Sequence, residues 1–192
     1  MNYIGIDIGS TCAKTVVLNE KKEIIQEFVQ PTGWSSIDTA EEILQKLKLA
    51  GIGLSDNSSC CVATGYGRIS VPYADKTVTE ITCHALGAVH LFQQSDLTVI
   101  DIGGQDTKII QIEQGFVKDF IMNDKCAAGT GRFLEVMANT LSLRPNEMFE
   151  LARLGSDTTI SSMCTVFAES EVIGLIGKGE PKENIAYAVV DS

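Results

Sequence analysis

The chain has 192 residues, of which 44% are hydrophobic, enough for one large domain or two small lobes with a buried core. It carries 25 Asp and Glu against 15 Lys and Arg, so it lacks the positive charge that attracts proteins to phosphate backbones. This balance excludes nucleic acid and anionic membrane as primary partners. Because no segment is long and apolar enough to cross a bilayer, we expect a soluble, cytoplasmic protein.

The first half of the chain predicts a hairpin, a third strand, a helix and a buried strand. Residues 3–8 and 15–18 form short β-branched runs around the turn at 9–11, and a third strand is expected near 24–29. Apolar residues recur at helical spacing over 36–49, at Ile37, Ala40, Ile43, Leu44 and Leu47. A strand at 60–63, a loop at 64–68 and a helix at 79–92 follow. Trp34 is expected to anchor a loop.

The opening pattern then returns about ninety residues later. Residues 97–102, the turn 103–106 and residues 107–112 repeat the order strand, Asp-x-Gly turn, strand. Such a repeat predicts two lobes of the same topology, residues 1–95 and 96–192. The second lobe is expected to continue with a glycine-rich loop at 126–131 and with helices at 132–141, 145–154, 165–176 and from Pro181 onward.

The two Asp-x-Gly turns are candidate phosphate-binding loops. Their backbone N–H groups and hydroxyls can meet phosphate oxygens, through Gly9, Ser10 and Thr11 in the first turn and Gly103, Gly104 and Gln105 in the second. One such turn is most often only a tight turn, but two in equivalent positions predict a pair that clamps a polyphosphate from both sides. The sequence marks of the rival nucleotide folds, G-x-x-x-x-G-K-[ST] and G-x-G-x-x-G, are absent.

Several polar side chains near these turns are candidates for catalysis. We expect Asp7 and Asp101 to be catalytic, and Asp7 can also hold Mg²⁺ through water. Glu80 or Gln105 could orient the water that attacks a phosphate. Lys14 could reach a phosphate or could equally be a solvated lysine at the end of a strand.

Six cysteines in a reducing compartment are more naturally core residues, metal ligands or redox groups than a disulfide framework. Cys126 and Cys164 each precede a predicted helix, and a two-fold axis would bring together the four thiolates that a cubane iron-sulfur cluster needs. Four thiolates from two chains would also suit a structural zinc ion. The other four are predicted to be core residues: Cys12, Cys60, Cys61 and Cys83.

The two loops resemble the phosphate-1 and phosphate-2 loops of the acetate kinase, sugar kinase, heat-shock chaperone and actin superfamily. That resemblance implies an α/β, two-lobed actin-like (ribonuclease H-like) ATPase fold. Since the superfamily closes its nucleotide cleft with a third, glycine-rich adenosine motif that is absent here, we expect a C-terminal part to be missing.

Four segments, at 64–68, 79–84, 122–135 and 161–171, resemble the signature of the 2-hydroxyacyl-CoA dehydratase activators, ATPases of the BadF/BadG/BcrA/BcrD type. The resemblance runs from Ile4 to about Ile176. It implies that Cys126 and Cys164 ligate one 4Fe-4S cluster at the interface of a homodimer, and that ATP or ADP binds with Mg²⁺.

The implied function is that of an oxygen-sensitive, ATP-dependent one-electron donor in anaerobic metabolism. It would take an electron from a small carrier, ferredoxin or flavodoxin, and pass it to an acceptor dehydratase or reductase that has its own iron-sulfur cluster. Two alternatives remain open. One is a phosphotransferase of the sugar kinase or acetate kinase kind, and the other is a nucleotide-dependent protein that polymerises as actin does.

Overall fold

The computed structural model describes residues 1–54, 59–161 and 163–192. It divides into two compact units. The first comprises Met1–Val99 with Gln111–Asp119, and the second comprises Ile100–Ile110 with Phe120–Ser192. The lobe boundary near residue 95, inferred from the sequence repeat, stays a prediction.

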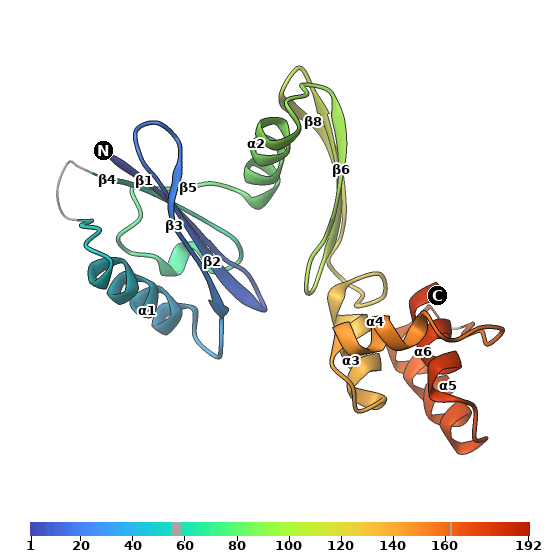
Figure 1. Cartoon of the computed structure of the whole chain (residues 1–192). Coiled ribbons are helices and arrows are strands. Elements are labelled where there is room, and N and C mark those ends of the chain that lie inside the picture. Colours follow the sequence, from blue (N-terminus) through green and yellow to red (C-terminus); the bar gives the residue numbers. More distant parts are fainter. Residues whose placement is uncertain (55–58, 162) are drawn as a thin grey trace. The chain divides into compact units, whose positions relative to one another are not determined.

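A five-stranded sheet forms the body of the first unit (Figure 1). Its central strand β1 (Asn2–Ile8) pairs antiparallel with β2 (Cys12–Leu18) and parallel with β4 (Ser59–Thr64). Alternate residues of β1, namely Ile4, Ile6 and Ile8, are buried, which is the period of two expected when one face of a sheet is covered. In spatial order the strands are β3 (Ile24–Pro31), β2 (Cys12–Leu18), β1 (Asn2–Ile8), β4 (Ser59–Thr64) and β5 (Lys76–Thr77).

Helix α1 (Ser36–Leu49) covers that buried face, with the bounds that its sequence pattern predicts. Ser35 caps its N-terminus by accepting a hydrogen bond from the backbone N–H of Asp38. Ala40, Ile43 and Leu47 pack with the isoleucines of β1 in one core cluster. A short 3-10 helix, η1 (Arg68–Ser70), follows β4, and α2 (Glu80–Phe92) begins after its cap Thr79.

A second sheet contains β6 (Leu97–Ile102), β7 (Thr107–Glu113) and β8 (Phe116–Asn123), in that order. The first two are the predicted repeat of the opening hairpin. The sequence did not predict β8. The turn before it has positive φ at Gln114 and Gly115, as the two central residues of a type I′ hairpin turn require.

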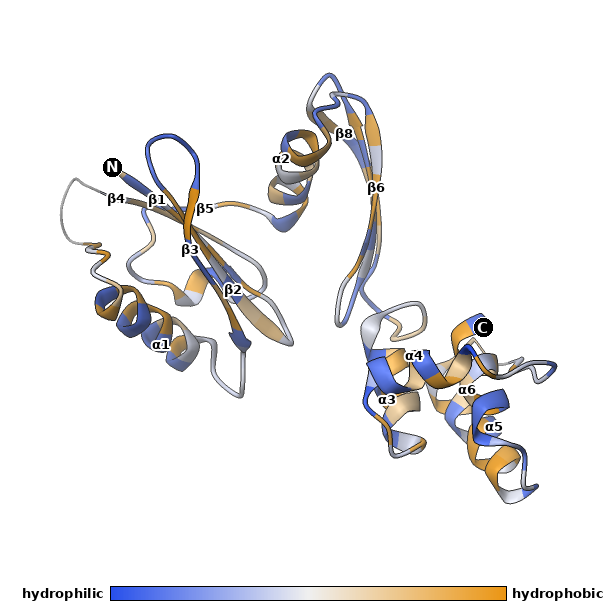
Figure 2. Cartoon of the chain, in the orientation of Figure 1, coloured by the Kyte–Doolittle hydropathy of each residue, from blue (hydrophilic) through white to orange (hydrophobic). Residues whose placement is uncertain are grey.

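Four helices complete the second unit, and all four were predicted: α3 (Gly131–Thr140), α4 (Pro145–Ala152), α5 (Thr165–Gly177) and α6 (Lys182–Asp191). They share one apolar core, in which Met137, Met148 and Val172 are fully buried. Helix α5 also keeps large apolar side chains exposed, Val166 and Phe167 among them. Orange ribbon in Figure 2 marks hydrophobic residues along this helix. Among the helices described, none is long and apolar enough to cross a membrane.

Candidate nucleotide and cysteine site

The first turn places Asp7 opposite Lys14 on the open face of the sheet. The Lys14 ammonium lies 3.0 Å from Asp7 Oδ2, and 45% of the lysine side chain is exposed. Burial lowers the pKa of Lys14, but the hydrogen bond with Asp7 and the charge of Asp7 outweigh it, so the net shift is upward. The other carboxylate oxygen, Asp7 Oδ1, is buried and accepts no hydrogen bond within the described part of the chain. A buried carboxylate oxygen without a donor fits hydrated Mg²⁺.

Thr32, the residue that follows β3, fixes the tip of this turn. The Thr32 hydroxyl donates to the carbonyl oxygen of Gly9 over 2.7 Å, and the Thr32 N–H donates to the carbonyl oxygen of Thr11 over 3.1 Å. Ser10 and Thr11 themselves are exposed. The hydroxyls predicted to meet phosphate are therefore accessible on a turn whose backbone is fixed.

The loop after β4 packs directly against Asp7. A Cβ atom at Gly65 would lie 2.4 Å from both Asp7 Oδ1 and the carbonyl oxygen of Ile8, so only glycine fits there. The Gly67 N–H donates to that same carbonyl oxygen of Ile8, and the Arg68 guanidinium donates to the carbonyl oxygen of Gly65. The segment 64–68, one of those that carry the family resemblance in the sequence, therefore packs against the start of the first turn.

The second turn has the same spacing and a different environment. Lys108 follows Asp101 by seven residues, as Lys14 follows Asp7, but its side chain is only 3% exposed. Its ammonium lies 2.6 Å from Asp106 Oδ1 and 3.4 Å from Asp101 Oδ2. Sequence reasoning missed both Asp106 and Lys108, although the shared seven-residue spacing would have indicated the lysine.

Backbone hydrogen bonds join the second turn to the loop that carries Cys126. The N–H groups of Gly131 and Arg132, the first residues of α3, donate to the carbonyl oxygens of Gly103 and Gly104 over 2.8 and 2.9 Å. The Thr107 hydroxyl donates to the carbonyl oxygen of Gly129. The second candidate phosphate loop and the cysteine loop are thus bonded to each other directly.

Cys126 and Cys164 are both exposed. Cys164 is the residue that precedes the first turn of α5, so it lies in the positive field of that helix. Cys126 lies five positions before the start of α3, whose own cap is Thr130, and the field of a helix terminus falls off within one turn. The predicted helix-start position therefore holds for Cys164 more closely than for Cys126.

The segments beside the two cysteines border one hollow of about 400 Å³. Ala128 and Gly129 line it from the Cys126 loop, and Met163 lines it from the residue before Cys164. No group of three or more His, Cys, Asp or Glu side chains within the described ranges is arranged to hold a metal. Two exposed thiols from one chain fit a cluster whose remaining ligands come from a second chain.

The other cysteines differ from this pair. Cys61 is buried as predicted, and burial raises the pKa of its thiol to about 12, which keeps it protonated. Cys12, Cys60 and Cys83 are half-buried rather than core residues.

The two candidates for orienting water occupy different units. Glu80 is the first residue of α2 and is half-buried, whereas Gln105 is exposed at the tip of the second turn. With Glu80, the first unit holds Asp7, Gly9, Ser10, Thr11 and Lys14, and the second holds Asp101, Gly103, Gly104, Gln105, Cys126 and Cys164.

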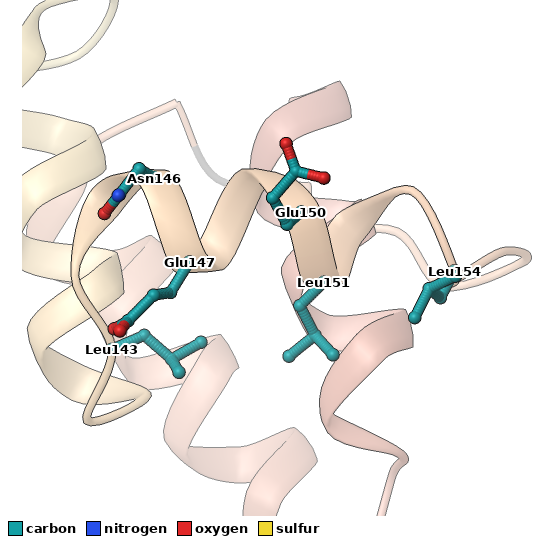
Figure 3. A pocket seen from close by; sticks show the side chains of 6 residues that line it. All are labelled: Leu143, Asn146, Glu147, Glu150, Leu151 and Leu154. Carbon is teal, nitrogen blue, oxygen red and sulfur yellow. The ribbon is translucent and has the colours of Figure 1, made fainter.

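A separate groove of about 500 Å³ runs along α4 (Figure 3). Its apolar wall includes Leu143 and Leu151. Its carboxylate Glu147 is paired with Arg144, which lowers the pKa of that glutamate. None of the predicted site residues lines this groove.

Comparison with known proteins gives a consistent picture. The model of the BadF/BadG/BcrA/BcrD ATPase family matches residues 4–192. The activator of lactoyl-CoA dehydratase from Anaerotignum propionicum is 46% identical over 191 residues, which are 98% of this chain and 73% of the relative.

Two solved structures superpose with a TM-score of 0.88, and each alignment covers 98% of this chain. One is component A of (R)-2-hydroxyglutaryl-CoA dehydratase from Acidaminococcus fermentans, at 44% identity, of which 73% is covered. The other is the activator of 2-hydroxyisocaproyl-CoA dehydratase from Clostridium difficile with bound ADPNP, at 37% identity, of which 70% is covered.

Proposed function

The chain belongs to the BadF/BadG/BcrA/BcrD ATPase family and has its mixed α/β, actin-like fold, and on this basis we propose that it activates a partner 2-hydroxyacyl-CoA dehydratase or a related reductase. It does so as an ATP-dependent one-electron donor. The electron comes from ferredoxin or flavodoxin, and the acceptor has an iron-sulfur cluster of its own. We place the protein in the cytoplasm, where thiols stay reduced.

Nucleotide binding rests on the two Asp-x-Gly turns. Gly9, Ser10 and Thr11 offer N–H groups and hydroxyls on a backbone fixed by Thr32, and Asp7 Oδ1 is free to accept from the water shell of Mg²⁺. Lys14 is half exposed, so it can leave Asp7 for a phosphate oxygen at little cost. The structure of a relative with bound ADPNP supports this assignment.

Cys126 and Cys164 would hold a 4Fe-4S cluster together with the same two residues of a second copy. Such a cluster stores one electron and releases it to an acceptor. The thiols are exposed, and Met163, Val166 and Phe167 beside Cys164 are exposed apolar side chains that a second copy would cover. The four-thiolate set suits zinc as well, which is why metal content decides the question.

The observation that carries the proposal is the direct bonding of the second turn to the cysteine loop. Because Gly103 and Gly104 accept the first hydrogen bonds of α3, a shift of this turn on nucleotide binding or hydrolysis moves the start of α3 as well. Nucleotide turnover and cysteine geometry are thereby coupled through two backbone hydrogen bonds.

Anaerobic purification tests the proposal. We expect a brown homodimer with about four iron per dimer, and we expect Cys126→Ser or Cys164→Ser to remove the colour. Cys83→Ser, a half-buried cysteine on α2, is the matched control and keeps it. Stoichiometric zinc without iron or acid-labile sulfide after reconstitution would refute the cluster. Formation of a sugar phosphate or acetyl phosphate would favour the phosphotransferase alternative.

A further inference from the structure

Asn123 is the last residue of β8, and its carboxamide forms hydrogen bonds with the backbone of the loop that follows. Its Oδ1 accepts a hydrogen bond from the Cys126 N–H over 3.2 Å. Its Nδ2 donates to the carbonyl oxygens of Cys126 and Ala128 over 2.9 and 3.1 Å. One side chain therefore binds the cysteine backbone on both sides, with both of its donors in use.

The remaining carbonyl groups of this loop also have donors. The Thr130 hydroxyl donates to the carbonyl oxygen of Ala127 over 2.6 Å, and the Thr107 hydroxyl donates to that of Gly129. Four consecutive carbonyl groups, from Cys126 to Gly129, are thus engaged by the protein itself.

The N–H groups of the same loop are in the opposite situation. For Ala127, Ala128 and Gly129, no N–H hydrogen bond occurs within the part of the chain that the structure describes. Successive backbone N–H groups without partners form an anion-binding surface. Since the carbonyl oxygens from Cys126 to Gly129 are occupied, these three N–H groups are the backbone groups next to Cys126 that are left to donate to a ligand.

We propose that Asn123 is a positioning residue for Cys126. It fixes the cysteine backbone and, by occupying two carbonyl oxygens, leaves the neighbouring N–H groups to donate to sulfur atoms of a bound anionic cluster. This inference rests on the proposed function, because it takes Cys126 to be a cluster ligand. Residues that orient metal ligands in this way commonly change metal affinity about 10- to 100-fold when they are replaced.

The metal-free protein tests the clamp itself, without reference to iron. In Asn123→Ala we expect the amide of Cys126 to lose its protection from hydrogen exchange, measured on a peptide that spans 124–130. The control is Asn139→Ala, since Asn139 is exposed on α3 and its side chain makes no hydrogen bond in the described structure. Wild-type exchange in Asn123→Ala would overturn the clamp.

The reconstituted protein tests the positioning role. Asn123→Ala should release iron to a chelator about tenfold faster than wild type or Asn139→Ala. Its reduction potential should also move to a more negative value, because N–H donors stabilise the reduced, more negative cluster. Asn123→Asp keeps the acceptor for the Cys126 N–H but loses both donors, so iron loss should stay fast while that amide remains protected.

Failure of the proposed function and failure of the role proposed for Asn123 give different results. If the wild-type protein binds no iron and sulfide, the proposed function fails and the exchange experiment still reports on the loop. If wild type carries the cluster and Asn123→Ala holds iron with unchanged rate and potential, the function stands and the role of Asn123 is refuted.

Discussion

The two Asp-x-Gly turns have similar sequences, but the fold gives them different charge environments. In the first turn, the lysine seven residues after the aspartate is half exposed and pairs with one carboxylate among the residues that the structure describes. In the second, the equivalent Lys108 is buried between Asp101 and Asp106. A repeated motif therefore conserves the backbone path, while the charge environment is set by one neighbouring residue, since the position of Asp106 is held by Cys12 in the first copy.

The largest effect is expected on the free energy of unfolding, to which Lys108 should contribute much more than Lys14. Lys108→Met leaves the buried carboxylate of Asp106 without its cation, which we expect to lower the free energy of unfolding by about 3–5 kcal/mol. Denaturant unfolding of the variant measures it. In the double variant Lys108→Met with Asp106→Leu, most of that loss should be recovered. A loss below about 1 kcal/mol in Lys108→Met would place this pair with ordinary surface ion pairs.

The next test asks whether both turns serve one reaction. Asp7→Ala and Asp101→Ala should each lower ATP hydrolysis by about 100-fold or more, the usual cost of removing one group that stabilises the transition state. Asp7→Ala should keep its iron, because Asp7 and the two cysteines belong to different compact units, each with its own core. An unchanged rate of ATP hydrolysis in both variants would show that neither aspartate takes part in the reaction.

A smaller effect is expected when the metal is removed. Air exposure should bleach the protein and weaken the dimer by about tenfold or more, since the proposed cluster would link the two chains and stabilise their association by mass action. Sedimentation of aerobic and anaerobic samples at one concentration measures this change. Hydrogen exchange at Gly131 and Arg132 should rise in the same samples while exchange at Gly9 stays constant. A metal-free dimer of full affinity would show that side-chain packing alone builds the interface.

The smallest effect concerns Lys14. Lys14→Met should change the free energy of unfolding by less than about 1 kcal/mol, because an exposed ion pair gains little over water. The pKa of Lys14 is raised above 10.5, so its contribution is complete at neutral pH and fades only as the pH rises through that higher value. In the same variant, the loss of binding free energy for the nucleotide should exceed the loss of unfolding free energy. Equal losses in Lys14→Met and Lys108→Met would contradict the contrast drawn between the two turns.

The sequence predicted the repeat, the helices and the candidate loops because each depends on local patterns. Strand β8 was missed because Phe116–Asn123 does not alternate regularly and Gln-Gly is a weak turn signal. The burial of Lys108 depends on packing that no spacing rule contains, and Asn123 acquires its role only from the way the chain turns after β8. Trp34, expected to anchor a loop, is fully exposed, so that prediction was wrong.

The contact between Gly65 and Asp7 also limits which sequences this fold can accept. Position 65 cannot accept a side chain for two independent reasons: its φ is +85°, and the carbonyl oxygen of Ile8 would lie 2.4 Å from an added Cβ. Gly115 has a similar φ of +81° but open space around it, so asparagine could replace it. In a library of random variants selected for nucleotide binding, position 65 should return glycine alone and position 115 should return several residues. The turn that carries Asp7, a candidate nucleotide-binding residue, thereby restricts which residue can evolve at position 65, outside that turn.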